Sequence, residues 1–163
     1  MIFVTVGTQG AFDRLISTMD QVAELLPHIT FVAQVSTGGS YKAKHMKALE
    51  FISPTEFDKY FSAAELVVSH AGMGTIISAF EREKPILVLP KLVKYGEHRN
   101  DHQLATAKRL ESLNYVHVAY DEQQLKEKVL SMAKGALNPL HSVGKYASLE
   151  LINSLQNFMA VPA

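Results

Sequence analysis

The chain contains no cysteine among its 163 residues. Disulfide bonds and thiolate chemistry are therefore excluded. The absence of cysteine fits a reducing compartment, so we expect the protein to be cytoplasmic.

Long apolar runs and an excess of charge of one sign are also missing. No apolar stretch approaches the roughly 20 residues needed to cross a bilayer, and the N-terminal run MIFVTVGT lacks the basic leader and the length of a secretory signal. Lysine plus arginine equals aspartate plus glutamate at 16 each, so no global field attracts nucleic acid or anionic lipid. We expect a soluble protein with no nucleic-acid partner, which reaches a membrane only by docking on something bound there.

Apolar patterning indicates the fold class. A hydrophobic content of 47% in 163 residues suffices for one core, so we expect a single domain over residues 1–163. The predicted strands cover residues 2–6, 29–35, 49–52, 67–68, 86–89 and 115–119. The predicted helices cover residues 12–26, 55–64, 75–80, 99–113, 121–134 and 143–158. Near-continuous apolar strands alternating with helices predict an α/β fold, a Rossmann-like doubly wound parallel sheet of about six strands that binds ligands beyond the carboxyl ends of its strands.

The stretch VVSHAGMGTIISAF, residues 67–80, joins a predicted strand to a predicted helix. Ser69, Gly72 and Gly74 leave little side-chain bulk at the turn, so backbone can approach a ligand closely. The first amides of a helix have no intrahelical partner and carry partial positive charge, which favours phosphate. An ordinary strand-to-helix connection is the alternative. His70 precedes the turn, and we expect it to order the turn or bind phosphate, with a charge state that can switch near neutral pH.

The loop after the first predicted strand, residues 7–11, lacks the full GxGxxG dinucleotide fingerprint, which argues against an NAD enzyme. Gly7, Thr8 and Gln9 could present amides and a hydroxyl to a diphosphate or to an acceptor. A simple tight turn before a helix is the alternative.

The loop after the fifth predicted strand contains a dense polar cluster, EHRNDHQ, at residues 97–103. Such a cluster is costly to bury without a ligand or partner. Three interpretations stay open. His98 and His102 have the four-residue spacing of zinc ligands but no obvious third ligand, and the cluster could also be a solvated helix start. Amides that both donate and accept suit a sugar, which is the interpretation we prefer, and we expect no metal.

Taken together, VTVGT, VSHAGMGT and KPILVLP followed by EHRNDHQ resemble the C-terminal, donor-binding half of family 28 glycosyltransferases. The resemblance covers about residues 2–109 and is strongest to stand-alone subunits of two-component transferases. These are bacterial exopolysaccharide or capsule enzymes and the eukaryotic dolichol-linked N-acetylglucosaminyltransferase. It implies a single GT-B half-domain that takes a UDP-sugar as co-substrate, with no other cofactor and no obligatory metal.

The resemblance also implies roles for individual residues. The turn and helix start would meet the diphosphate, the backbone of the segment after the third strand would meet uracil, and the polar cluster would hold the donor sugar. Where many relatives carry a glutamate for the ribose hydroxyls, this chain has Ser78. The donor-binding residues expected in this way, together with those from the loops above, are Gly7, Thr8, Gln9, Phe51, Ile52, Ser69, His70, Gly72, Met73, Gly74, Thr75, Asp101, His102 and Gln103.

A GT-B half implies a partner. By resemblance, a membrane-associated subunit at the inner face of the membrane binds the lipid-linked glycan acceptor and recruits this chain. The C-terminal helix, within residues 143–160, is a docking candidate, with packing onto its own domain as the alternative. We expect transfer with inversion, with Glu97 or His98 as general base unless the base lies on the partner. A non-catalytic sugar-nucleotide-binding subunit is the main rival, and an epimerase of related fold is a weaker one.

Overall fold

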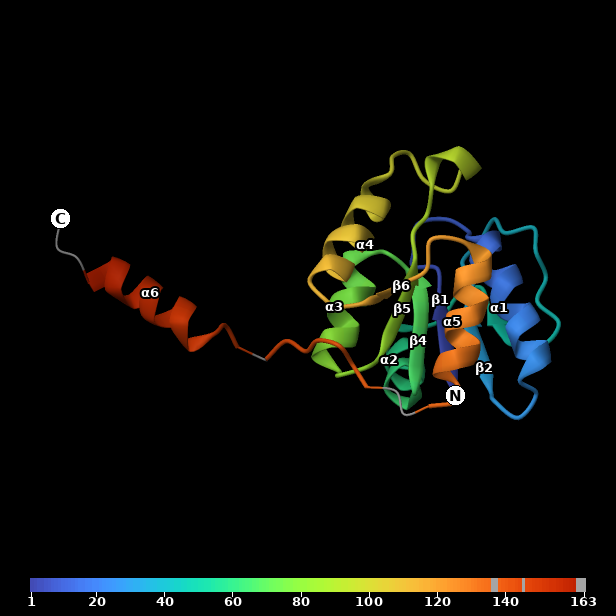
Figure 1. The fold of residues 1–163 in the computed structure, drawn as a ribbon, viewed down its shortest axis with the longest axis horizontal. Helices are drawn as coiled ribbons and strands as arrows, with labels where there is room; N and C mark the ends of the chain where they lie inside the picture. The colour runs from blue at the N-terminus through green and yellow to red at the C-terminus, as the bar shows by residue number, and fades with distance from the viewer. Residues whose placement is uncertain (136–137, 145, 161–163) are drawn as a thin grey trace.

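Six strands form one parallel sheet with the order β3-β2-β1-β4-β5-β6 (Figure 1). They belong to a computed structural model that describes residues 1–135, 138–144 and 146–160. The strands are β1 (Ile2–Thr5), β2 (Phe31–Gln34), β3 (Lys47–Leu49), β4 (Leu66–His70), β5 (Ile86–Leu89) and β6 (His117–Val118). The predicted Rossmann-like sheet is therefore confirmed.

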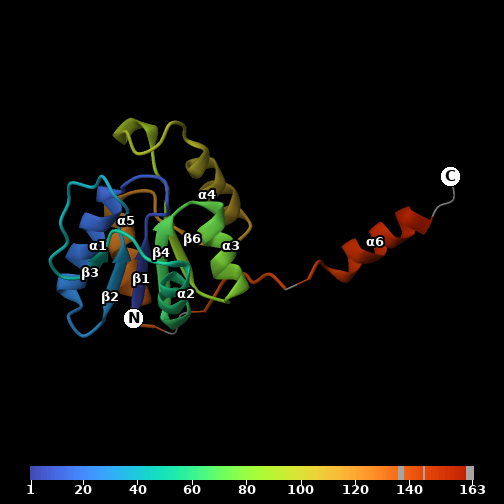
Figure 2. The same cartoon turned by 180° about the vertical axis from the view of Figure 1, so that it is seen from behind.

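Helices cover both faces of the sheet. Helices α1 and α5 lie on one face, and α2, α3 and α4 lie on the other, as the two opposite views show (Figures 1 and 2). The bounds are α1 (Asp13–Leu25), α2 (Pro54–Ala63), α3 (Met73–Glu81), a 3₁₀ turn η1 (Val93–Tyr95), α4 (His102–Ser112), α5 (Glu122–Met132) and α6 (Leu149–Ala160).

The central strand β1 shows why its sequence is apolar without a break. Successive side chains of a strand point to opposite faces. Ile2 and Val4 pack in the core beneath α1 and α5, whereas Phe3 packs in the core beneath α2 and α3. The Phe3 ring contacts Phe57 and Phe61 of α2 at centroid distances of 5.5 and 6.1 Å. Both faces are thus buried, as the apolar run predicts.

The loop between β2 and β3 looks flexible in the sequence, because it contains STGGSYKAK, but α1 holds it by two aspartates. Asp20, 1% exposed, accepts hydrogen bonds from the backbone N–H groups of Lys44 (3.0 Å) and His45 (2.7 Å) and from the Tyr41 hydroxyl (2.9 Å). Burial alone would raise the pKa of Asp20, but these hydrogen bonds hold it below its ordinary value of 3.8. Asp13 accepts from the backbone and hydroxyl of Ser40 in the same way.

Two predicted boundaries near the site are corrected. The third strand was expected over residues 49–52 but ends at Leu49, because its partner β2 ends at Gln34. Phe51 and Ile52 therefore lie in the loop before α2. The helix expected over residues 99–113 begins at His102, since Asn100 and His98 form a turn through their own polar groups.

The C-terminal helix is also shorter than expected. It begins at Leu149 rather than at residue 143, because the Ser148 hydroxyl caps it by accepting from the Leu151 N–H at 3.2 Å. His141 lies before the helix and is stacked on Tyr115, with ring centroids 3.7 Å apart. Part of the expected single domain lies outside the described residues, namely residues 136–137, 145 and 161–163. Of these, residue 145 falls in the predicted helix.

Helix α6 stands apart from the α/β domain in both views (Figures 1 and 2). Packing onto its own domain, the alternative left open above, is not what the structure shows. Its apolar side chains are exposed, with Phe158 80% and Met159 74% accessible. In the described part of the chain, no helix is long and apolar enough to cross a membrane.

We predict that Asp20→Asn lowers the free energy of unfolding by about 2 kcal/mol at pH 7, because the carboxylate loses charge-assisted hydrogen bonds. A folded-state pKa below 3.8 means that this stabilisation is present above pH 3.8 and is lost as the pH falls through the folded-state value. Urea unfolding curves of wild type and variant should therefore converge in acid. Asp58→Asn is the control, because Asp58 pairs with Arg82 at the surface, and it should cost less than about 1 kcal/mol. Equal losses of unfolding free energy in the two variants would contradict the stabilising role of the hydrogen bonds to Asp20.

Candidate functional site

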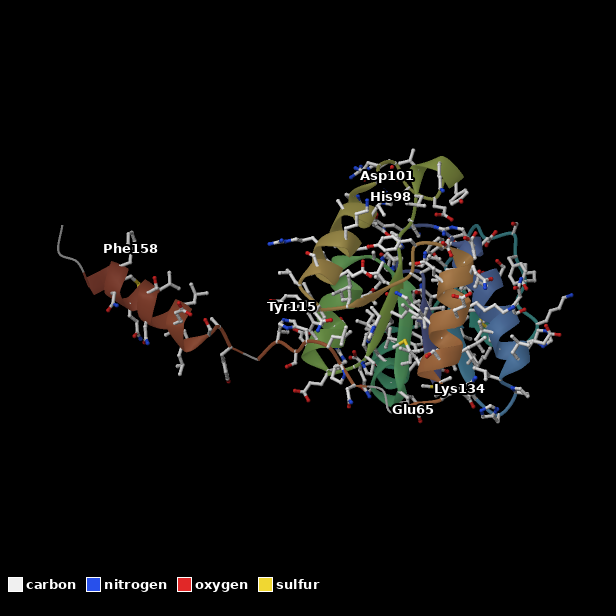
Figure 3. The ribbon with its side chains drawn as sticks, in the orientation of Figure 1. Glu65, His98, Asp101, Tyr115, Lys134 and Phe158 are labelled. Atoms are coloured by element: carbon white, nitrogen blue, oxygen red, sulfur yellow. The ribbon has the colours of Figure 1, made fainter. Side chains whose placement is uncertain are left out.

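A cavity of about 790 Å³ opens at the carboxyl ends of the strands. It lies where the strand order reverses, because β1 is flanked by β2 on one side and by β4 on the other. Ligands of doubly wound proteins bind at this position, and the volume is that of a small-molecule site. In Figure 3, His98 and Asp101 lie at this end of the domain, and Glu65 and Lys134 lie at the opposite end.

The structure brings most of the predicted site residues to this cavity. Those that line it are Gly7, Thr8, Gln9, Phe51, Ile52, His70, Gly72, Gly74, Thr75, His98, His102 and Gln103. Ser78, at the position where the resemblance implies a glutamate for the ribose hydroxyls, lines the cavity as well. Four predicted residues are placed elsewhere. They are Ser69, Met73, Glu97 and Asp101.

The His70 ring fills the space between two turns. A Cβ atom added to Gly72 would lie 2.0 Å from His70 Nε2, and one added to Gly7 would lie 2.5 Å from His70 Cε1. Gly7 also has a φ of +77°, which favours glycine. The ring therefore sets the separation of the β1–α1 and β4–α3 turns, and both positions require glycine.

His70 does not switch its charge near neutral pH, contrary to the expectation from sequence. Burial, followed by the positive charge of Lys91, lowers the pKa of His70 to about 4. The Thr5 carbonyl opposes part of this lowering, although the buried Nδ1 makes no hydrogen bond of good geometry within the described chain. The ring is therefore neutral at pH 7.

Helix α3 points its N-terminus into the cavity. The helix begins at Met73 with Gly72 as N-cap, and no side chain caps it. The first backbone bond back to the cap is from Ile76 N–H to Gly72 C=O, at 3.1 Å. The N–H groups of Met73, Gly74 and Thr75 thus have no intrahelical acceptor and lie at the positive end of the helix dipole. Met73 contributes backbone only, because its side chain is 46% exposed outside the cavity.

Polar residues at the ends of neighbouring strands form the cavity floor. Thr5 pairs in register with Gln34 of β2 and with Ser69 of β4. The Thr5 hydroxyl donates to Gln34 Oε1 at 2.6 Å, and Gln34 Nε2 donates to the Gly7 carbonyl at 3.1 Å. The sequence analysis missed Thr5 and Gln34, although a polar residue closing an apolar strand is a usable indication. Ser69 lies beneath the floor and donates to the His70 carbonyl.

Glu97 is bound into the scaffold instead of facing the cavity. Its carboxylate forms a two-pronged ion pair with Arg14 of α1, at 2.7 and 2.8 Å, and accepts the Leu92 N–H at 2.9 Å. Both side chains are about nine-tenths buried. A carboxylate so occupied is a poor proton acceptor, so the geometry argues against Glu97 as the general base.

His98 is better placed for that role, because it lines the cavity. Its ring meets the His102 ring edge-on at a centroid distance of 4.6 Å, and the His102 ring also contacts Asn100. Asp101 instead accepts the Val93 N–H at 2.9 Å and orders the loop. Among the described residues, no group of three or more histidine, aspartate or glutamate side chains is arranged to hold a metal ion.

Gln103 and Lys91 form the wall between β5 and α4. The Lys91 N–H donates to Gln103 Oε1 at 3.1 Å, which fixes the amide so that its NH₂ is the group left for a ligand. Gln103 is 4% exposed and Lys91 is 1% exposed. Lys91 was missed in the sequence, because a lysine after a strand is ordinarily an exposed loop residue.

Comparison with known proteins now identifies the family. A model of the glycosyltransferase family 28 C-terminal domain matches residues 1–155. The chain belongs to this family. The match covers the three sequence blocks noted above and the loops around the cavity.

Individual proteins are similar to the chain in sequence or in fold. The chain is 31% identical over 89 residues to the UDP-N-acetylglucosamine transferase subunit ALG13 of Candida albicans, which covers 55% of this chain and 29% of that protein. The solution structure of ALG13 superposes with a TM-score of 0.60 at 18% identity, over 94% of this chain and 93% of the other. The UDP-GlcNAc 2-epimerase of Neisseria meningitidis gives 0.62 at 13% identity, over 96% and 44%. These structures support the fold alone. The chain spans less than a third of the length of the curated relatives that it matches.

We predict that Gly72→Ala destabilises the protein by about 1–3 kcal/mol, because its Cβ collides with the His70 ring. Thermal or urea unfolding measures this loss, and His70→Ala in the same chain should remove most of it. Gly74→Ala is the matched control, since a Cβ there meets nothing within 4 Å. It should stabilise helix α3 by about 0.5–1 kcal/mol. Additive losses in the Gly72/His70 double variant would show that the ring is not the obstacle.

Proposed function

We propose that this chain is the donor-binding, catalytic subunit of an inverting glycosyltransferase. It moves a sugar from a UDP-sugar to a lipid-linked acceptor in exopolysaccharide, capsule or related glycan synthesis. The observation that carries the proposal is the uncapped N-terminus of α3, which opens into the cavity of a family 28 domain at the reversal of strand order.

The proposed reaction follows from that geometry. The bond between the anomeric carbon and the β-phosphate oxygen breaks while the acceptor oxygen attacks the opposite face, which inverts the anomeric carbon. The amides of Gly74 and Thr75 stabilise the charge that develops on the departing UDP, so the step needs no metal. His98 accepts the proton of the acceptor hydroxyl, unless a base of the partner does so.

The donor sugar is proposed to lie against the wall that contains Gln103 and His102. The NH₂ of Gln103 points away from Lys91 and can donate to a sugar hydroxyl. Uracil is proposed to meet the backbone of Phe51 and Ile52. This arrangement leaves the ribose near Ser78, whose hydroxyl is a shorter ligand than a glutamate.

The test combines a donor-binding measurement with a transfer assay. Calorimetry against a panel of UDP-sugars should identify one preferred donor. Gly74→Asp should weaken its binding at least about tenfold, because a carboxylate then faces the diphosphate, whereas Gly74→Asn controls for size. Gln103→Ala should reduce transfer by the chain assayed with membranes of its source organism. Gln123→Ala, on the exposed face of α5, should not.

Each outcome decides between functions. Unchanged transfer by both Gly74→Asp and Gln103→Ala would contradict the catalytic role. Donor binding by the wild type without any transfer in the presence of the source membranes would favour a non-catalytic, sugar-nucleotide-binding subunit. Conversion of the UDP-sugar to its epimer without an acceptor would favour an epimerase.

We further propose that a membrane-associated subunit binds the acceptor and recruits this chain through α6 to the inner face of the membrane. Leu151, Ile152, Leu155, Phe158 and Met159 follow helical spacing along one face of α6. An isolated helix of 12 residues is marginal in water, so an exposed apolar face of this length calls for a surface to cover it.

We predict that truncation after Gly144 abolishes sedimentation with source membranes and leaves UDP-sugar binding unchanged. Phe158→Asp should reproduce the loss by placing a charge in the apolar face. Asn157→Asp is the control, because it adds the same charge to the opposite face. Undiminished sedimentation of the truncated chain would rule out α6 as the docking element.

A further inference from the structure

Lys91 stands out in the cavity by its charge. Of the described residues that line the cavity, it is the only lysine, arginine, aspartate or glutamate. It is 1% exposed and has no carboxylate within ion-pairing distance among the described residues. A buried ammonium with no paired anion is costly, so its position calls for an explanation.

The partners of the Lys91 ammonium are backbone carbonyls of the loop after β1. Its Nζ donates to the Gln9 carbonyl at 2.8 Å and to the Gly10 carbonyl at 3.0 Å. An ammonium has three N–H donors, and these two carbonyls use two of them. Lys91 therefore ties the end of β5 to the loop that contains Thr8 and Gln9. One N–H of its ammonium is used by neither carbonyl, and the Phe12 ring centroid lies 5.5 Å from Nζ.

The electrostatics of the cavity favour an anion beside this lysine. Burial lowers the pKa of Lys91, and Glu97 opposes the lowering only in part. An anionic ligand would restore the stability of the charged form. His70 is neutral and contributes no charge, and the N-terminus of α3 supplies a partial positive charge of about one half. A diphosphate ester has two negative charges, so these fixed dipoles leave most of its charge uncompensated.

We propose that Lys91 is a charge-bearing positioning residue of the donor site, which holds the Gly7–Gly10 loop and supplies the full positive charge that the diphosphate requires. This inference rests on the proposed function and deepens it. The loop and the N-terminus of α3 then approach the diphosphate from opposite sides of the reversal between β1 and β4. Lys91 makes the site selective for uridine diphosphates over neutral nucleosides.

The test compares two probes by calorimetry, UDP and uridine, which share the nucleoside and differ by the anionic diphosphate. Lys91→Met should weaken UDP binding about ten- to hundredfold, because an interaction with a charged group is lost, and should change uridine binding less than about twofold. Lys91→Arg should retain most of the UDP affinity. Lys94→Met is the matched control, since it removes the same charge from an exposed residue of the same loop, and it should have little effect on either probe.

A second measurement uses the wild-type protein in case Lys91→Met does not fold. The ¹³Cε resonance of Lys91, assigned through the backbone, should shift on titration with UDP and stay in place with uridine. Equal weakening of UDP and uridine binding by Lys91→Met, or equal shifts of the resonance with both, would show that Lys91 only holds the loop in place. Either result would overturn the inference. Failure of the wild type to bind UDP would overturn the proposed function, and with it the role of Lys91. UDP binding that is insensitive to Lys91 would overturn this inference alone.

Discussion

The pairing of β1 with two neighbours determines where everything else in this molecule can be. β1 pairs in parallel with β2 on one side and with β4 on the other, both in register from Ile2 to Thr5. The chain therefore leaves β1 in one direction and later returns on its other side, so the loops after β1 and β4 cannot cover the same space. The gap between them becomes the cavity, and its floor is made of the polar ends of the three central strands. The His70 ring fills the remaining space and keeps the two turns apart.

The sequence predicted this architecture well, because the relevant information is local. Apolar runs with β-branched residues and helical spacing both act within a few residues. The errors in boundaries have a different origin. The end of β3 depends on where β2 ends, which is a tertiary fact. The start of α4 depends on how Asn100 and His98 bond with one another, and the start of α6 depends on which of several serines becomes the cap.

The loops of the site could be predicted from the sequence, but the buried long-range contacts that hold these loops could not. Glycines after strands and a cluster of seven polar residues are visible in the sequence, and the structure brings most of them to one cavity. Glu97 pairs with Arg14, which is 83 positions away in the sequence, and no local sequence pattern predicts this pairing. The same holds for Lys91, which reaches the carbonyl of Gln9 at a separation of 82 positions. A long-range partner decides whether a charged side chain acts on a ligand or holds the scaffold.

Two buried cations that contact the loop after β5 or belong to it, Arg14 of α1 and Lys91, illustrate this distinction. Arg14 meets a carboxylate in the bidentate geometry that suits a guanidinium, so its charge is satisfied inside the protein. Lys91 meets two carbonyl dipoles and, at 5.5 Å, the Phe12 ring, which stabilise an ammonium but do not neutralise it. The ion pair suits the scaffold, because its two charges compensate each other whether or not a ligand is present. A site for an anionic donor benefits from the buried ammonium, because the cost of burying the charge is offset when the anion binds. The loop after β5 thus combines one closed ion pair that fixes its shape with one buried ammonium that no carboxylate neutralises.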